Sequence, residues 1–440
     1  MLESFFRLRE TGTSVGTEIR AGATTFMTMS YIISVQPTVL ASAGMDFGAV
    51  MMATCLSSAL ATFLMGLLAN YPIALAPAMG HNFFFAFTVC LAMQIPWQAA
   101  LGAVFISGTL FLFLSFFGLR ESIINALPAT LKSAIAAGIG LLIGLVGFEW
   151  AGIVVDAPGT LVGLGDLRSP PTVMALFGTI LIAVLMVLKV RGAILLGIMA
   201  TALIGIPLGL VKYQGIIGAP PSISPTLLQL DIGAALKLGL LNVIFIFFFL
   251  DLFDTVGTLV GVSQQGGFMK DGKLPRARPA LLSDSFGTVS GALLGTSTVT
   301  SYIESSAGIA EGGRSGLANM VTGILFLASI LFFPIAEMLG GGYAVSKDLV
   351  LYPVIAPALI IVGSMMLKTV RDIPWDDPTE AIPAFLTLMV MPMTFSITEG
   401  IAFGFISFAL LKLVRGQGRE VHWLLYLFAG LFVIRYLFMT

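Results

Sequence analysis

Long apolar runs recur along the whole chain and are separated by short polar connections. Each run has roughly the 17 to 25 residues that an α-helix needs to cross the hydrocarbon core of a membrane. The first seven runs lie near residues 22–43, 48–69, 72–94, 98–118, 131–151, 172–188 and 192–211, and the next seven lie near 238–262, 279–296, 298–312, 315–335, 348–367, 381–397 and 399–413. The pattern predicts an all-α polytopic membrane protein with fourteen transmembrane segments.

A further apolar run at residues 422–438 is interrupted by Arg435. A helix with a charge inside it fits the membrane surface better than the hydrocarbon core. We therefore expect residues 421–440 to form a C-terminal interfacial helix, with a fifteenth span as the alternative.

Composition excludes several classes of protein. Of the 440 residues, 57% are hydrophobic and only 10% are charged, which leaves too little polar surface for a soluble fold. The net charge of −1 comes without a basic stripe, so no nucleic-acid partner is indicated. Two cysteines and two distant histidines, His81 and His422, predict neither a disulfide framework nor a metal site.

The positive charges suggest an orientation. Residues 1–21 carry charges of both signs and no cleavable apolar core, so we expect a cytoplasmic N-terminal arm. With that end inside, most Lys and Arg residues fall in cytoplasmic connections, such as the cluster at 270–278. Because seven is odd, the second seven spans must enter the membrane with the opposite orientation. This arrangement is the 7+7 inverted repeat of many transporters.

The third and tenth spans both look interrupted, as a matched pair in such a repeat would be. Pro72 and Pro77 should keep residues 71–78 extended, so that a helix begins only near Met79 or Gly80. In the tenth span, the β-branched and hydroxyl-rich residues 295–301 precede a short helical stretch that ends near Gly312. Each span is predicted to be a short extended strand leading into a half-helix, with the two half-helix starts facing a polar cavity.

Carboxylates lie on two of the predicted spans. Asp251, Asp254, Thr255 and Thr258 share one face of the eighth span, and the same spacing repeats from Ser301 to Gly308 around Glu304. Ionisable groups at this depth are costly and usually face a cavity, a partner or a substrate. The pattern therefore indicates a transport site.

Structural interpretations of these carboxylates stay open at this point. Ser301 and Glu304 have the spacing of a capping box, in which Glu304 would only satisfy backbone donors at a helix start. Asp251 fits an ion-pair or helix-packing role as well as a ligand role.

Five ordered motifs resemble a known family. They are GATTFMTMSYIISVQP (22–37), APAMGHNFFFAF (76–87), FLDLFDTVGTLVG (249–261), LGTSTVTSYIESSAGIAEGGRSGL (294–317) and PAFLTLMVMPMTFSITEGIAFGF (383–405). The chain is similar to AzgA-like purine permeases of the nucleobase:cation symporter-2 family. The resemblance implies a UraA-like fold with a core domain at 22–118 (spans 1–4) and 238–335 (spans 8–11). It implies a gate domain at 119–212 (spans 5–7) and 347–414 (spans 12–14).

The resemblance also implies roles for individual residues. Asp254 and Glu304 match the two substrate-binding carboxylates, Thr258 would lie near Asp254, and Asn82 matches the asparagine of the third span. Asp251 matches a polar position important for transport.

The third span also departs from the family pattern. His81 and Phe83 stand where the family usually has a small or apolar residue and an alanine. They either narrow the pocket and change its specificity, or only repack the span.

The family resemblance implies proton-coupled uptake of adenine, guanine or hypoxanthine. Carboxylates and an amide can bind the donor and acceptor atoms of a purine, while Phe83, Phe84 or Tyr302 could stack on its ring. Burial favours the protonated form of a carboxyl group, so Glu304 or Asp254, with Asp251 as a further candidate, could carry the coupling proton. No other cofactor is expected.

The expected location is the bacterial inner (plasma) membrane, and the sequence leaves a homodimer open. Two other classes of protein are weaker alternatives. A small-anion transporter should present positive charge to its substrate, and a membrane-embedded enzyme should show a nucleophile with its base or a metal cluster.

Overall fold

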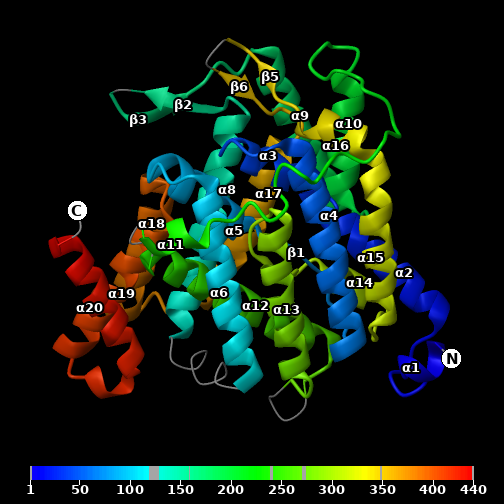
Figure 1. Ribbon diagram of the computed structural model, residues 1–440. Coiled ribbons are helices and arrows are strands. Elements are labelled where there is room, and N and C mark those ends of the chain that lie inside the picture. The colour runs from blue at the N-terminus through cyan, green and yellow to red at the C-terminus, as the bar shows by residue number, and fades with distance from the viewer. Residues whose placement is uncertain are drawn as a thin grey trace. The chain divides into compact units, whose positions relative to one another are not determined.

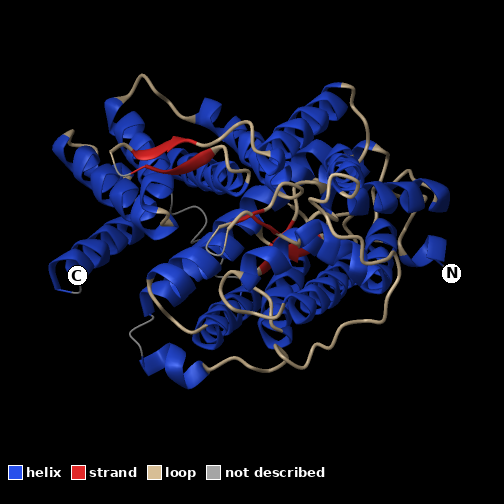
Figure 2. Cartoon of the chain, turned by 90° about the horizontal axis from the view of Figure 1, so that it is seen from above, coloured by secondary structure: helices blue, strands red, loops and turns tan. Residues whose placement is uncertain are grey.

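The computed structural model describes residues 2–117, 128–157, 159–237, 241–269, 274–346 and 349–438. The chain divides into a larger unit, Met1–Phe117 with Phe148–Ala358, and a smaller unit, Gly118–Gly147 with Leu359–Thr440. Helices account for most of the described residues, and strands occur only as short pairs (Figures 1 and 2). The helical membrane-type architecture predicted from the apolar runs is thus confirmed.

The larger unit contains most of the elements. Its helices are α1 (Leu2–Phe5), α2 (Val15–Met29), α3 (Ile32–Ala41), α4 (Phe47–Leu64), η1 (Met65–Ala69), α5 (Met79–Phe83), η2 (Phe84–Ala92), α6 (Trp97–Phe117), α9 (Pro170–Val187), α10 (Ala193–Gly205), α11 (Ile232–Lys237), α12 (Leu241–Gly266), α13 (Ala277–Leu294), α14 (Ser305–Ala310), α15 (Leu317–Ser329), η3 (Ile330–Phe332) and α16 (Phe333–Gly340). Its strands are β1 (Leu75–Pro77), β2 (Val154–Ala157), β3 (Leu161–Leu164), β4 (Val299–Ser301), β5 (Tyr343–Ala344) and β6 (Val350–Leu351).

The smaller unit is entirely helical in its described part. It holds η4 (Leu367–Asp372), α18 (Pro378–Thr394), α19 (Ile397–Val414), η5 (Gly418–Glu420) and α20 (Trp423–Phe438). The chain passes between the units within α8 (Ala129–Trp150) and α17 (Ala356–Met366).

Seven helices in the described ranges are long and apolar enough to cross a membrane. They are Phe47–Ala69, Trp97–Phe117, Ala129–Trp150, Pro170–Val187, Leu241–Gly266, Leu317–Gly340 and Ile397–Val414. Other predicted spans are shorter or broken. The run at 22–43 forms two helices, α2 and α3, which are separated at Ser30 and Tyr31. The count of fourteen spans remains a prediction.

The interrupted third and tenth spans have the predicted form. β1 and β4 pair antiparallel, with Leu75 opposite Ser301 and Pro77 opposite Val299. Helix α5 begins at Met79, directly after β1, and α14 begins at Ser305, shortly after β4. Both extended segments therefore lead into short helices, and Figure 1 shows β1 in the interior of the larger unit, among α12, α13 and α14.

Side chains of neighbouring helices satisfy the outer edges of this two-stranded sheet. The Thr62 hydroxyl on α4 donates to the Leu75 carbonyl and accepts from the Leu75 N–H, each at 3.0 Å. On the other edge, the Thr288 hydroxyl on α13 donates to the Val299 carbonyl at 3.0 Å. A strand edge left unpaired at membrane depth would cost several kcal/mol for each exposed group. These bonds allow irregular backbone inside an otherwise apolar bundle.

The last helix of the smaller unit packs along its predecessor. Phe405 on α19 contacts Phe428 and Phe432 on α20, and Arg435 lies 2.6 Å from Glu399 near the opposite ends of the two helices. α20 is thus antiparallel to α19 over most of its length. This packing fits the alternative of a fifteenth span, and the interfacial placement of residues 421–440 remains a prediction.

Candidate functional site

Asp254 lies near the middle of α12, where the helix passes the β1–β4 pair. Its Oδ2 accepts a hydrogen bond from the Thr300 hydroxyl on β4 at 3.3 Å, and the Thr258 hydroxyl approaches the same carboxylate from one turn along α12. The side chain is 41% exposed, although Asp251 and Thr255 on the same helix are fully buried. Asp254 therefore borders a water-accessible space within the bundle.

Glu304 immediately precedes α14. Its Oε1 accepts a hydrogen bond of 2.7 Å from the Tyr31 hydroxyl, at the break between α2 and α3. The capping-box alternative for Ser301 and Glu304 is wrong, because α14 begins only at Ser305 and the Glu304 side chain makes no cap bond. The half-buried carboxylate is thus held from another span and is not used to start its own helix.

The structure brings four of these side chains into one electrostatic cluster. The carboxylates of Asp254 and Glu304 lie close enough to repel each other when both are ionised, and the neutral side chains of Tyr31 and Tyr302 lie near both. Tyr302 is buried and its hydroxyl donates to the Pro77 carbonyl of β1. Because that hydroxyl is already used, Tyr302 can offer a ligand its ring but not its donor.

Asn82 is fully buried on α5 and is only partly satisfied. Its Nδ2 donates to Gln36 Oε1 on α3 at 2.8 Å, and Gln36 in turn donates to Thr296 and Ser297 at 2.9 and 2.8 Å. The Oδ1 of Asn82 has no hydrogen-bond partner in the described part of the chain. The bond to Gln36 thus fixes the orientation of the Asn82 amide and leaves the Asn82 oxygen as an unused acceptor.

The predicted aromatic wall already has partners. Phe83 stacks on Phe87 with ring centroids 5.6 Å apart, and Phe84 meets Phe247 of α12 edge to face at 4.8 Å. Both side chains are buried, so either would have to move to stack on a bound ring. Tyr302, the third aromatic candidate, is also buried and lies close to Asp254 and Glu304.

Asp251 lies in a different group, one turn before Asp254. Its oxygens lie 3.3 Å from the Thr255 hydroxyl and 3.4 Å from the Thr288 hydroxyl. The Thr255 hydroxyl is also 2.7 Å from Asp284 on α13, whose other oxygen accepts the Ser301 N–H at 3.1 Å. This buried network joins α12 and α13 to the backbone of β4. It fits the alternative in which Asp251 has a helix-packing role.

Tyr31, Gln36 and Asp284 are among the residues of these networks that had no assigned role in the sequence. Each is a polar side chain inside an apolar run, which is the signal that could have identified it. Tyr31 and Gln36 stand in the first of the five motifs, whereas Asp284 lies outside all of them.

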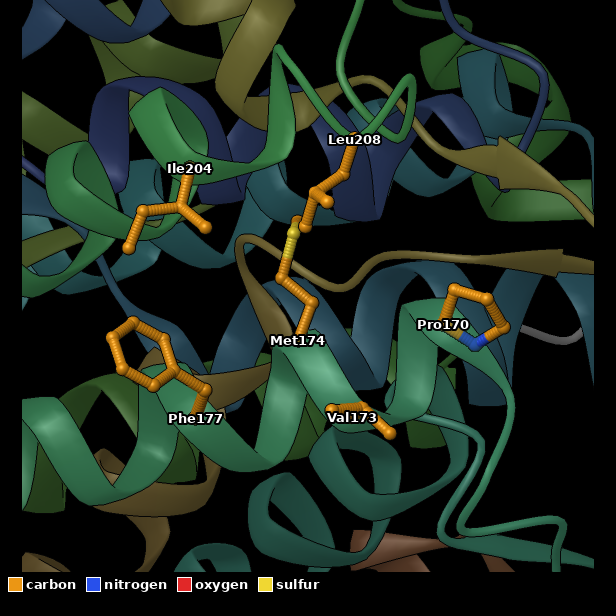
Figure 3. Close-up of a pocket in the computed structure, with 6 residues that line it drawn as sticks. All are labelled: Pro170, Val173, Met174, Phe177, Ile204 and Leu208. Atoms are coloured by element: carbon orange, nitrogen blue, oxygen red, sulfur yellow. The ribbon is translucent and has the colours of Figure 1, made fainter.

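A separate hollow of about 340 Å³ lies on α9 and α10. Figure 3 shows Pro170, Val173, Met174 and Phe177 of α9 facing Ile204 of α10 and Leu208 just beyond it. The lining has no donor or acceptor side chain, so this hollow cannot bind a polar ring specifically. Its exposed rim, with Leu208 62% exposed, suits contact with lipid.

Comparisons with known proteins identify the family. The family described as "Permease family" matches residues 16–403. A putative permease of Methanocaldococcus jannaschii is 51% identical, covering 100% of this chain and 99% of that protein. An adenine permease of Escherichia coli is 45% identical (100% and 96% covered), and a guanine/hypoxanthine permease of Bacillus subtilis is 46% identical (98% and 98%).

Solved structures with a similar fold are distant in sequence. The transmembrane domain of a cyanobacterial bicarbonate transporter superposes with a TM-score of 0.65 and 14% identity, covering 88% of this chain and 97% of that one. At this identity the likeness concerns the fold alone. It does not extend to the substrate.

Proposed function

We propose that this chain, which belongs to the permease family, imports purine nucleobases across the plasma membrane together with protons. The family resemblance drawn from the five motifs is confirmed, and the protein is a multi-pass membrane transporter and not an enzyme. Relatives at 45% and 46% identity bear the names adenine permease and guanine/hypoxanthine permease, which supports a purine as the substrate.

One observation carries the proposal. Asp254 presents a water-accessible carboxylate in the middle of a long apolar helix and is bonded to Thr300 of β4, while Asn82 of α5 has a buried oxygen without a partner among the described residues. A carboxylate and an amide oxygen accept hydrogen bonds, and a purine offers N–H donors on its edge. Thr258 and the Tyr302 ring complete the proposed binding surface on the same side.

Proton coupling is assigned to Glu304 and Asp254, with Asp251 in a supporting position. A neutral carboxyl group is cheaper to hold at membrane depth than an ionised one, so proton uptake and base binding favour each other. On the inner side, release of the base and of the proton would follow together. Because the proposed site offers carboxylates, a small-anion substrate is disfavoured even though the fold resembles an anion transporter.

We place the chain in the membrane as a fourteen-span inverted repeat with the N-terminus in the cytoplasm. Movement of the core domain against the gate domain would open the site to each side in turn. A homodimer is compatible with this scheme and is a matter for measurement.

Uptake into proteoliposomes tests the proposal. Radiolabelled adenine, guanine, hypoxanthine, xanthine and uracil are supplied with and without an inward proton gradient, to the wild type and to Asp254→Asn. Gradient-driven accumulation of a purine that is lost in Asp254→Asn supports the proposal. Asp156→Asn, on the exposed hairpin strand β2, is the matched control and should transport normally. Folded wild type that accumulates no base would refute it.

A further inference from the structure

His81 is a buried imidazole that no described residue hydrogen-bonds. It lies in α5, next to Asn82, and its side chain is only 2% exposed. In the described ranges neither Nδ1 nor Nε2 makes a hydrogen bond. Buried polar atoms of this kind are rare because they have given up water without a replacement. A purely packing role would be filled at lower cost by an apolar side chain.

The position of the ring points toward the proposed substrate. Nδ1 is 3.8 Å from Asp254 Oδ2, too far for a hydrogen bond but within reach of a molecule bound at that carboxylate. Asp254 is 41% exposed, so a water-accessible space adjoins the pair. The Asn82 oxygen, the next polar group along α5, also lacks a partner among the described residues. Two consecutive residues of α5 thus have unsatisfied polar atoms, and one of them lies beside the exposed carboxylate of α12.

The chemistry of these groups is complementary. An ionised aspartate and the Asn82 oxygen can only accept hydrogen bonds, whereas a neutral imidazole offers one donor and one acceptor. The edges of a purine carry ring nitrogens or an exocyclic oxygen, which accept, beside N–H groups, which donate. If the protein site contained only acceptors, the acceptor atoms of the nucleobase would stay unpaired. Unpaired groups of this kind weaken binding strongly.

We propose that His81 is a substrate-binding residue, whose ring N–H donates to an acceptor atom of the nucleobase while Asp254 accepts from a neighbouring N–H. This inference rests on the proposed function, since it takes a purine as the ligand. It resolves the two alternatives left open for His81 in favour of specificity. The ring N–H is a donor that an ionised Asp254 cannot provide.

Equilibrium binding to the purified full-length protein tests the inference. The ligands are adenine and its 1-deaza, 3-deaza and 7-deaza analogues, each of which replaces one ring acceptor by C–H. If the wild type prefers hypoxanthine, its 3-deaza and 7-deaza analogues are used together with purine, which lacks the exocyclic oxygen. His81→Leu should bind the parent base roughly tenfold more weakly, the effect of one lost hydrogen bond. For the one analogue that lacks the contacted atom, wild type and His81→Leu should bind equally.

Controls separate this result from a packing effect. His81→Gln retains a donor and should recover part of the affinity, and His422→Leu, at the other histidine, should bind like the wild type. An equal loss of affinity for every analogue, or no loss at all, would overturn the role of His81. Failure of the wild type to bind any purine would instead overturn the proposed function.

A second readout does not depend on the substitution at His81. In a His422→Gln background, His81 is the sole histidine, so ¹⁵N-histidine labelling gives signals from one ring. Addition of the base should shift one ring nitrogen in the manner of a new hydrogen bond. Unchanged ring signals at saturating base would refute the contact even if His81→Leu did not fold.

Discussion

Tyr31→Phe removes one oxygen atom and with it the 2.7 Å hydrogen bond to Glu304. The ring and its buried packing are retained, so the change isolates the hydroxyl group. That hydroxyl donates to the carboxylate and thereby stabilises its ionised form. Without it, Glu304 should hold its proton more readily.

The size of the effect follows from the kind of bond. A hydrogen bond to a charged group contributes about 1.5 to 3 kcal/mol, and 1.36 kcal/mol corresponds to one pH unit. If transport requires protonated Glu304, uptake in Tyr31→Phe should persist to a pH roughly one to two units higher than in the wild type. The direction is upward because the lost bond had favoured the charged form.

The assay is the initial rate of labelled purine uptake into proteoliposomes as a function of external pH, with the internal pH clamped. Tyr302→Phe is the matched control, since its hydroxyl donates to the Pro77 carbonyl and not to a carboxylate. It should leave the pH midpoint in place. A midpoint that stays unchanged in folded Tyr31→Phe, or that moves downward, would show that this bond does not govern the coupling proton.

Three further predictions follow from other parts of the structure. Glu304→Gln should abolish gradient-driven accumulation but still exchange labelled for unlabelled purine in counterflow; normal proton-driven accumulation would remove Glu304 as the coupling residue. Gly316→Ala should destabilise the protein by roughly 2 to 4 kcal/mol or prevent folding, because its Cβ would lie 2.0 Å from the Gly66 carbonyl oxygen, between η1 and α15. Thermal unfolding in detergent measures this, and Gly16→Ala, with open space around it, should unfold like the wild type. The antiparallel packing of α20 on α19 favours the alternative in which residues 422–438 form a fifteenth span after the fourteen of the repeat. A C-terminal reporter should then lie on the opposite side of the membrane from residues 415–420, and labelling of both on one side would support the interfacial placement.

Local chemistry was enough to predict the interruptions of the third and tenth spans. Pro72 and Pro77 cannot continue a helix and lack an N–H to donate, so the extended segment ahead of Met79 could be expected from the sequence. The break of the first run between α2 and α3 was missed. It falls at Ser30 and Tyr31, before Pro37, at a place where no residue by itself excludes a helix.

Helical spacing predicted the polar face of α12 but not the separate roles of its two aspartates. Asp251 and Asp254 are three residues apart and so share a face. Their surroundings differ. Helix α13 brings Thr288 and Asp284 to the network around Asp251, whereas β4 brings Thr300 and α5 brings His81 to Asp254. Nothing in the sequence of α12 contains this information.

The sequence by itself determined the membrane class, the apolar runs, the half-helices and the family, because these depend on hydrophobicity, backbone stereochemistry and ordered motifs. Only the tertiary structure decided which polar groups meet. The contacts of Tyr31 with Glu304 and of Gln36 with Asn82 join residues 273 and 46 positions apart. Such pairs depend on which helices pack together and in what register, since a hydrogen bond requires its two atoms to lie within about 3 Å.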